Sequence, residues 1–192
     1  MTHQVHSFEP PERFVAGTVG EPGDRTFFLQ ARGGGRVVSV ALEKVQVSLL
    51  AEKLEELLVE ANKRFGVSLP EAPVLTVHDN EPLDTPVDEE FRVGTLGLAF
   101  DVDTATVVIE AIAAGEAEAE AEAEEETAAV EEDEEADADR DRLRVRLTPQ
   151  ETRAFIERAR RVLASGRQPC PLCGQPLDPR GHLCPRHNGY HR

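Results

Sequence analysis

The chain has 192 residues, of which 40% are hydrophobic, and its formal net charge is −16 at pH 7. This length fits one domain of about 100–150 residues with a small appendage. Its apolar runs all fall short of the roughly 18 residues that span a membrane, and the first residues lack the basic and apolar regions of a secretory signal. We therefore expect a cytoplasmic protein that makes no membrane contact.

The charge is unevenly distributed along the chain. Residues 116–139 contain 14 acidic residues and no basic one. Residues 1–115 have 9 basic and 19 acidic side chains, a net charge of −10, whereas residues 140–192 have 12 basic and 4 acidic side chains, a net charge of +8. This asymmetry indicates either an anionic partner for the basic end or docking of that end on the acidic body.

The first 42 residues predict a β-meander. Apolar, β-branched and aromatic side chains concentrate in four runs, at residues 4–8, 13–19, 25–31 and 36–42. Three glycines at residues 33–35 suit a hairpin turn, because glycine tolerates a positive φ. Gly17, Gly20 and Gly23 have the spacing of some phosphate loops. Neither a Gly-Lys-Ser/Thr sequence nor a helix follows them, so we predict a hairpin turn there too.

Between residues 43 and 65 the hydrophobic period changes to that of an amphipathic helix. Its apolar stripe is typical of a helix that faces a core, and Gly66 follows at the position where a glycine often ends a helix. Gly94 and Gly97 indicate a bulge or a close backbone approach in a later strand. Three more strands are predicted, at residues 74–77, 91–100 and 105–113.

The acidic residues 116–139 form a low-complexity segment with no apolar face to bury, which predicts a disordered or frayed helical linker. After it, alternating apolar residues and arginines at 142–147 predict a half-buried strand. Residues 148–151, Thr-Pro-Gln-Glu, then have the pattern of a helix start with a capping box, and the helix should reach about Ala164.

These elements predict an α+β protein with a mostly antiparallel sheet covered by two helices, a disordered acidic insertion and a C-terminal zinc knuckle. A lone strand and helix bury too little surface to fold separately, so we expect the acidic segment to interrupt a single domain. The expected parts are the sheet and first helix at 1–115, the acidic linker at 116–139, the completing strand and helix at 140–168, and the zinc-knuckle tail at 169–192.

All three cysteines lie in this tail, which indicates a zinc site. Cys170 and Cys173 have the x2 spacing with which two thiolates hold one tetrahedral ion, and Cys184 is the remaining thiol. A redox C-x-x-C motif begins a helix, whereas this one follows a helix. Three thiolates and one imidazole would make a closed site of the structural type. By spacing, the fourth ligand is His182 or His187, with His191 as a more remote choice.

Two other patterns indicate chemistry less specifically. His78-Asp79 could form an acid/base pair, although a surface turn explains the same residues. A set of arginines could meet nucleic-acid phosphates, but it lacks interleaved aromatic residues for base stacking, so contact with protein is an equal alternative. These arginines are Arg142, Arg144, Arg146, Arg153, Arg158, Arg160 and Arg161.

The runs RFVAGTVGEPGDRTFFLQAR, VVSVALEKVQV and CPLCGQPLDPRGHLCPRHNGY resemble an actinobacterial family known only as a domain of unknown function. The resemblance spans nearly the whole chain except the acidic segment. It implies an uncharacterised cytoplasmic protein, often encoded near a kinase-like protein and near a histidine-phosphatase-like protein that is an expected partner. The family's tail pattern, Gly-His-x-Cys-Pro-Arg-x-Asn-Gly-Tyr, favours His182 over His187 as the fourth ligand and assigns no catalytic residue.

We expect a zinc-binding protein that acts as a non-enzymatic binding or adaptor module, with a structural zinc in its tail. The first alternative is a phosphoester or nucleotide hydrolase that works with the phosphatase-like protein. It would need an open metal site or a cleft with paired titratable groups. The second alternative is an RNA- or DNA-binding protein that uses the seven arginines.

Overall fold

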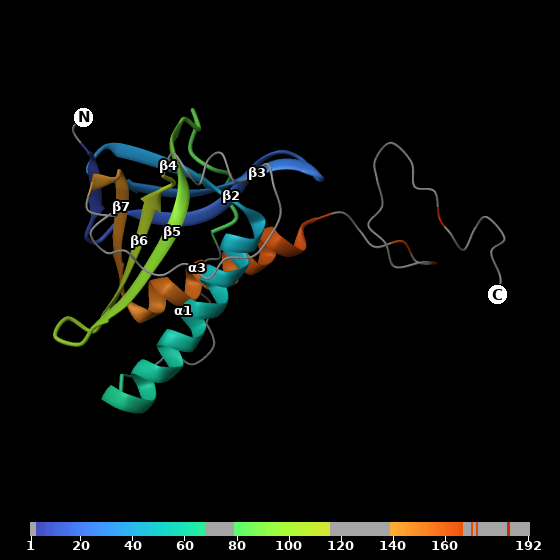
Figure 1. The fold of residues 1–192 in the computed structure, drawn as a ribbon. Helices are drawn as coiled ribbons and strands as arrows, with labels where there is room; N and C mark the ends of the chain where they lie inside the picture. The colour runs from blue at the N-terminus through green and yellow to red at the C-terminus, as the bar shows by residue number, and fades with distance from the viewer. Residues whose placement is uncertain are drawn as a thin grey trace.

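In the part of the chain that the structure describes, seven strands form one sheet in the order β1-β7-β6-β5-β4-β3-β2, with two helices beside it (Figure 1). The computed structural model describes residues 3–67, 79–115 and 139–166, together with Cys170, Leu172 and Cys184. Several predicted features therefore lie outside the described residues: the strand at 74–77, His78, nearly all of the acidic segment, Cys173, His182, His187 and His191.

The four strands predicted at the N-terminus are present as β1 (Val5–Phe8), β2 (Arg13–Glu21), β3 (Asp24–Gly33) and β4 (Arg36–Leu42). Only the last three form the predicted meander, because β1 lies at the opposite edge of the sheet from β2. β2, β3 and β4 pair in antiparallel fashion. Gly23, with φ 103°, and Gly34, with φ 58°, lie in the two hairpin turns. Gly17 and Gly20, which the sequence predicts in the same turn as Gly23, lie inside β2 instead.

Helix α1 (Lys44–Phe65) follows the predicted amphipathic segment closely. Its backbone starts at Glu43, whose N–H donates to Oε1 of Gln46 at 2.8 Å. It ends at Gly66 in the left-handed conformation, φ 63°, as the sequence predicts. Its buried face consists of Val47, Leu50, Ala51, Leu54, Leu58 and Ala61.

The second half of the sheet consists of β5 (Glu89–Asp101), β6 (Thr106–Ala113) and β7 (Arg142–Leu147). The register of β5 shifts between Val93 and Thr95, which confirms the predicted bulge at Gly94, whereas Gly97 pairs with Glu110 in regular register. β7 lies between β6 and β1, so the strand that follows the acidic segment is an inner strand of the sheet.

Four of the six strand pairs are antiparallel, as expected for a mostly antiparallel sheet, but the sheet is mixed because the other two pairs are parallel. β4 pairs with β5 in parallel, and β1 pairs with β7 in parallel. Parallel neighbours require a crossover connection, and α1 lies in the connection between β4 and β5. The strand patterns in the sequence show which residues are buried but carry no information on strand direction.

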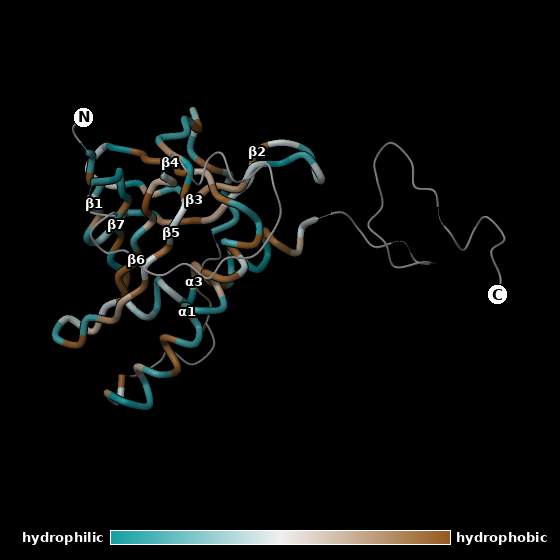
Figure 2. The backbone as a smooth tube through the Cα atoms, viewed as in Figure 1, coloured by the Kyte–Doolittle hydropathy of each residue, from teal (hydrophilic) through white to brown (hydrophobic). Residues whose placement is uncertain are grey.

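Helix α3 (Pro149–Ala164) has the predicted capping box, in which Thr148 Oγ1 accepts from the Glu151 N–H at 3.2 Å. It contacts α1 and also β2, β6 and β7. Phe155 and Ile156 of α3 share one hydrophobic core with Leu50 and Leu54 of α1 and with the sheet. Figure 2 shows hydrophobic residues along the strands and helices, whereas the tip of the β2–β3 hairpin is hydrophilic. Neither helix has the length and apolar character needed to cross a membrane in the described residues.

Residues 79–84, here called the 79–84 segment, pack against another part of the sheet. Leu83 forms a small buried cluster with Val15, Phe28 and Ala41, which come from β2, β3 and β4. Gly17 permits this close approach, because a Cβ at Gly17 would lie 2.6 Å from the Leu83 side chain. Strands β2–β4 therefore pack on the helices and also on the 79–84 segment.

Candidate functional site

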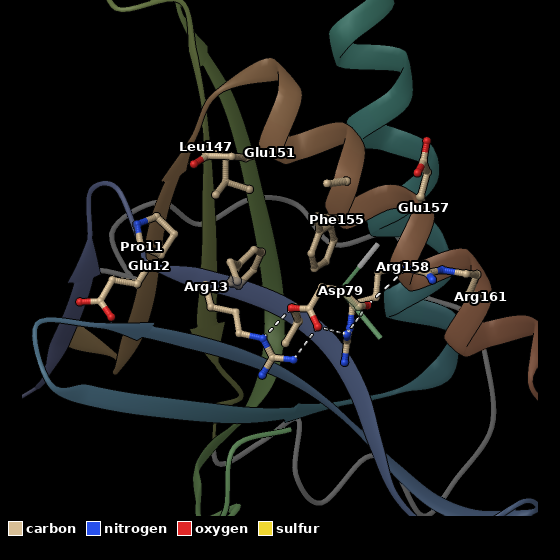
Figure 3. A pocket seen from close by; sticks show the side chains of 13 residues that line it. Pro11, Glu12, Arg13, Asp79, Leu147, Glu151, Phe155, Glu157, Arg158 and Arg161 are labelled. Atoms are coloured by element: carbon tan, nitrogen blue, oxygen red, sulfur yellow. Dashed lines mark hydrogen bonds and ion pairs between the residues drawn. The ribbon is translucent and has the colours of Figure 1, made fainter. Parts of the chain in front are cut away.

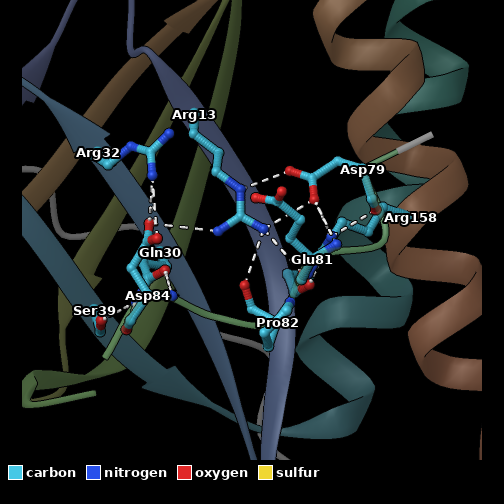
Figure 4. Close-up of polar contacts among 10 residues, drawn as sticks. Arg13, Gln30, Arg32, Ser39, Asp79, Glu81, Pro82, Asp84 and Arg158 are labelled. Atoms are coloured by element: carbon cyan, nitrogen blue, oxygen red, sulfur yellow. Dashed lines mark hydrogen bonds and ion pairs between the residues drawn. The ribbon is translucent and has the colours of Figure 1, made fainter. Parts of the chain in front are cut away.

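Three charged side chains form a partly buried cluster where β2, α3 and the 79–84 segment meet (Figure 4). Arg13 begins β2 and Arg158 lies on α3, and both are buried. Asp79 lies between them and accepts hydrogen bonds from Arg13 Nε at 2.6 Å, Arg13 Nη2 at 2.9 Å and Arg158 Nη1 at 2.7 Å. Buried charges are tolerated when they are paired in this way. We call these three residues the Arg–Asp–Arg cluster.

The two arginines also hold the backbone of the 79–84 segment. Arg13 Nη2 donates to the carbonyl of Glu81 at 3.0 Å, and Arg158 Nη2 donates to the same carbonyl at 2.7 Å. Arg158 Nε donates to the carbonyl of Ala16 in β2 at 2.9 Å. Hydrogen bonds from charged donors are about twice as strong as neutral ones. The cluster therefore ties the segment to one strand and one helix.

A second polar contact holds the same segment at Asp84. Buried Gln30 of β3 accepts from the Asp84 N–H at 2.8 Å and donates to the Asp84 carbonyl at 3.0 Å. The Asp84 carboxylate accepts from Arg32 Nη1 at 3.1 Å and from Arg13 Nη1 at 3.4 Å. Backbone and side chain of Asp84 are thus both bonded to the sheet.

These neighbours keep Asp79 ionised. The hydrogen bonds from Arg13 and the charge of Arg158 lower the pKa of Asp79 below its ordinary 3.8, against the opposing effect of burial. The bond to Asp79 raises the pKa of Arg13, whereas burial lowers the pKa of Arg158. The Glu81 N–H also donates to Asp79, at 3.1 Å. His78 of the predicted acid/base pair lies outside the described residues, and Asp79 accepts hydrogen bonds that hold the fold together.

A cavity of about 180 Å³ opens beside the cluster, between the start of β2 and α3 (Figure 3). One wall is apolar, with the rings of Phe14 and Phe155 stacked at a centroid distance of 4.8 Å. Two carboxylates on its lining already serve the fold, because Glu12 accepts from the Gly34 N–H at 3.1 Å and Glu151 caps α3. Neither is a free acid or base.

Most of the seven arginines proposed for nucleic acid contact acidic residues of the fold. Arg144 and Arg146 both lie within 3.3 Å of Glu9, and Arg146 also pairs with Asp101 at 2.5 Å. Arg160 pairs with Glu55. Arg161 of α3 donates a hydrogen bond to Asn80, and Arg158 of α3 belongs to the Arg–Asp–Arg cluster. The other two members are Arg142 on β7 and Arg153 on α3. Acidic side chains of residues 1–115 thus neutralise much of the positive charge of residues 140–166.

Arg158 requires a correction. The sequence groups it with the arginines that could meet nucleic-acid phosphates, but the structure buries it. Its position three residues after Phe155 lies beside the buried face of the helix, and its guanidinium group finds acceptors at Asp79, Glu81 and Ala16. The Arg–Asp–Arg cluster and the Gln30–Asp84 contact are not evident in the sequence. The one available signal is Arg13 itself, a charged residue at the start of an otherwise apolar strand.

Two predicted metal ligands belong to the described residues. Cys170 and Cys184 are buried and are not joined in a disulfide, and their Sγ atoms lie 3.9 Å apart. Cys173 and His182, with His187 as its alternative, lie outside the described residues. Among the residues that the structure describes, no three metal-ligating side chains come together.

Residues 6–184 match the model of a family described as a protein of unknown function (DUF3090). The matched range includes the sheet from His6 onward, both helices, all three cysteines and His182. The comparisons with curated proteins and with solved structures gave no match.

Proposed function

The chain belongs to this family of unknown function, and we propose that it is a zinc-binding module whose structural zinc holds the C-terminal tail for contact with a partner protein. The proposed ligands are Cys170, Cys173, His182 and Cys184, with His187 as the alternative to His182. A site with four protein ligands has no open position for a catalytic water, so the zinc stabilises the tail and takes no part in a reaction.

The distance between Cys170 and Cys184 supports this proposal. Two sulfur atoms about 2.3 Å from a tetrahedral zinc ion lie about 3.8 Å apart, and the observed separation is 3.9 Å. A disulfide would bring the sulfurs to about 2.05 Å. Fourteen positions separate the two cysteines in the sequence, so their proximity comes from the conformation of the tail and not from the spacing of the motif.

The two alternative functions have less support from the described contacts. A hydrolase needs a free acid or base, and the Asp79 carboxylate is occupied by two arginines and a backbone N–H. A nucleic-acid surface needs exposed positive charge, and Arg144, Arg146 and Arg160 pair with carboxylates of the same chain. An adaptor role requires neither feature.

Elemental analysis of the purified full chain tests the proposal. We expect one zinc ion per chain, and loss of that zinc in Cys170→Ser and in Cys184→Ser. His182→Ala should lose zinc while His187→Ala retains it, and the reverse result would identify His187 as the fourth ligand. His191→Ala is the matched control and should bind zinc normally. A metal-free protein with an intact fold would show that the proposal is wrong.

A further inference from the structure

An exposed apolar strip crosses α1 and α3 where the two helices lie side by side. Val45 and Leu49 in the first turns of α1 are 67% and 48% exposed. With Leu163 and Ala164 in the last turn of α3, they line one groove of about 570 Å³. The polar side chains of this groove are Lys44, Ser48 and Arg160. We call it the α1–α3 groove.

A second exposed apolar side chain lies in the tail. Leu172 occupies the position between Cys170 and Cys173 in the C-x2-C motif, and it is 49% exposed, whereas Cys170 is buried. A zinc ion held by the two flanking thiolates would keep this leucine at the tip of a tight turn. The chain thus has an apolar groove on the helices and an apolar side chain on the tail, and both are open to solvent in the described residues.

The connection between them is short. Ala164 lines the groove, and Leu172 follows eight residues later. Eight extended residues reach at most about 29 Å, so Leu172 is confined to that distance from Ala164 and the groove is within its reach. A short linker gives an effective concentration in the millimolar range, and a weak contact is then sufficient for docking.

The net charge of the body attracts the tail, whereas the groove itself is lined by the basic side chains of Lys44 and of Arg160, which pairs with Glu55. Residues 167–192 contain four arginines and one aspartate, and residues 1–115 have a net charge of −10. Opposite net charges increase the local concentration of the tail at the body. The groove lies at the end of α3 from which the tail departs, so the tail begins beside the surface that it would occupy.

We propose that the zinc-held tail docks on the α1–α3 groove, with Leu172 in contact with Leu49 and Leu163. This inference rests on the proposed function, because it names the surface that the zinc-held tail contacts. Docking covers the exposed apolar strip and fixes the side of the molecule on which the tail meets a partner protein.

Limited trypsin digestion of the full chain measures the docking. The reporter is the rate of cleavage after Arg180, which the docked tail protects. We expect Leu49→Ser and Leu172→Ser each to raise this rate roughly fivefold, and the double variant to raise it no further, because the two residues contribute to one contact. Val59→Ser is the matched control, since Val59 is 39% exposed on the same helix but does not line the groove.

Zinc content, measured on each variant, separates the two proposals. Zinc should remain at one ion per chain in Leu49→Ser, because Leu49 is remote from the ligands in the sequence. Unchanged digestion of Leu49→Ser, or additive effects of the two leucines, would overturn the docking. If Arg180 is protected from cleavage only at high protein concentration, the groove binds a second copy of the chain, and the proposed docking of the tail is overturned as well. The wild-type chain could lack zinc while Leu49→Ser and Leu172→Ser still raise the cleavage rate without adding in the double variant. In that case the proposed function fails and the docking stands.

Discussion

Replacing Asp79 with asparagine removes the negative charge that two buried arginines share. The carboxylate accepts three hydrogen bonds from Arg13 and Arg158 at 2.6–2.9 Å and a fourth from the Glu81 N–H. The asparagine side chain has the same shape, but one of its two ends is a donor that faces other donors. Arg13 then keeps only Asp84, at 3.4 Å, as an acidic partner among the described residues.

We expect Asp79→Asn to lower the free energy of unfolding by about 3 kcal/mol at pH 7. Removal of one partner from a buried ion pair costs about 3–5 kcal/mol. The Asp79 side chain is 35% exposed, so water compensates part of the loss and the lower end of this range applies. With a urea m-value of about 2 kcal/mol/M, the unfolding midpoint should fall by roughly 1.5 M.

Urea unfolding of wild type and variant across pH provides the assay. Because the folded state lowers the pKa of Asp79, its contribution is complete above the ordinary pKa near 3.8 and is lost as the pH falls through the folded pKa. The difference between the two proteins should therefore shrink below about pH 4. Exposed Asp88 lies after the same segment, and Asp88→Asn should change stability by less than about 0.5 kcal/mol. If Asp79→Asn behaves like this control at pH 7, the cluster does not hold the 79–84 segment.

Two further predictions concern the sheet. Gly17→Ala should lower the free energy of unfolding by about 1–3 kcal/mol, because its Cβ would lie 2.6 Å from the Leu83 side chain. Gly97→Ala is the matched strand control, with its nearest neighbour at 3.7 Å, and equal urea midpoints for the two variants would contradict the predicted clash. The hydrogen bond from Arg146 is the main cause that lowers the pKa of Asp101 from 3.8 to about 2. An NMR titration should give that value, and Asp101→Asn should reduce the melting temperature at pH 7 more than at pH 2; a carboxyl pKa near 4 would refute the ion pair.

Much of the secondary structure could be predicted from the sequence because its signals are local. The helix that starts at Thr148 has its capping partner three residues later, and the left-handed Gly66 ends α1 as its position predicts. The hairpin turn at Gly34 and the bulge at Gly94 follow from the same kind of evidence. Each depends on residues within one or two turns of chain.

Strand order, strand direction and the partners of buried charges depend instead on residues that are far apart in the sequence. Two-residue periodicity shows which side of β7 is buried, but its place between β1 and β6 brings together residues near positions 6, 110 and 143. Arg13, Asp79 and Arg158 likewise come from three separate parts of the chain.

The sequence by itself therefore determined the helices, the strands of the described residues and the set of cysteines and histidines from which a zinc site is expected. The tertiary structure alone decided that the sheet is mixed, that Arg158 is buried, and that Cys170 and Cys184 lie within 3.9 Å of each other. The physical reason is that a cap, a turn or an apolar stripe is encoded by neighbouring residues. A buried ion pair or a pair of thiols is formed only when the packed fold brings distant residues together.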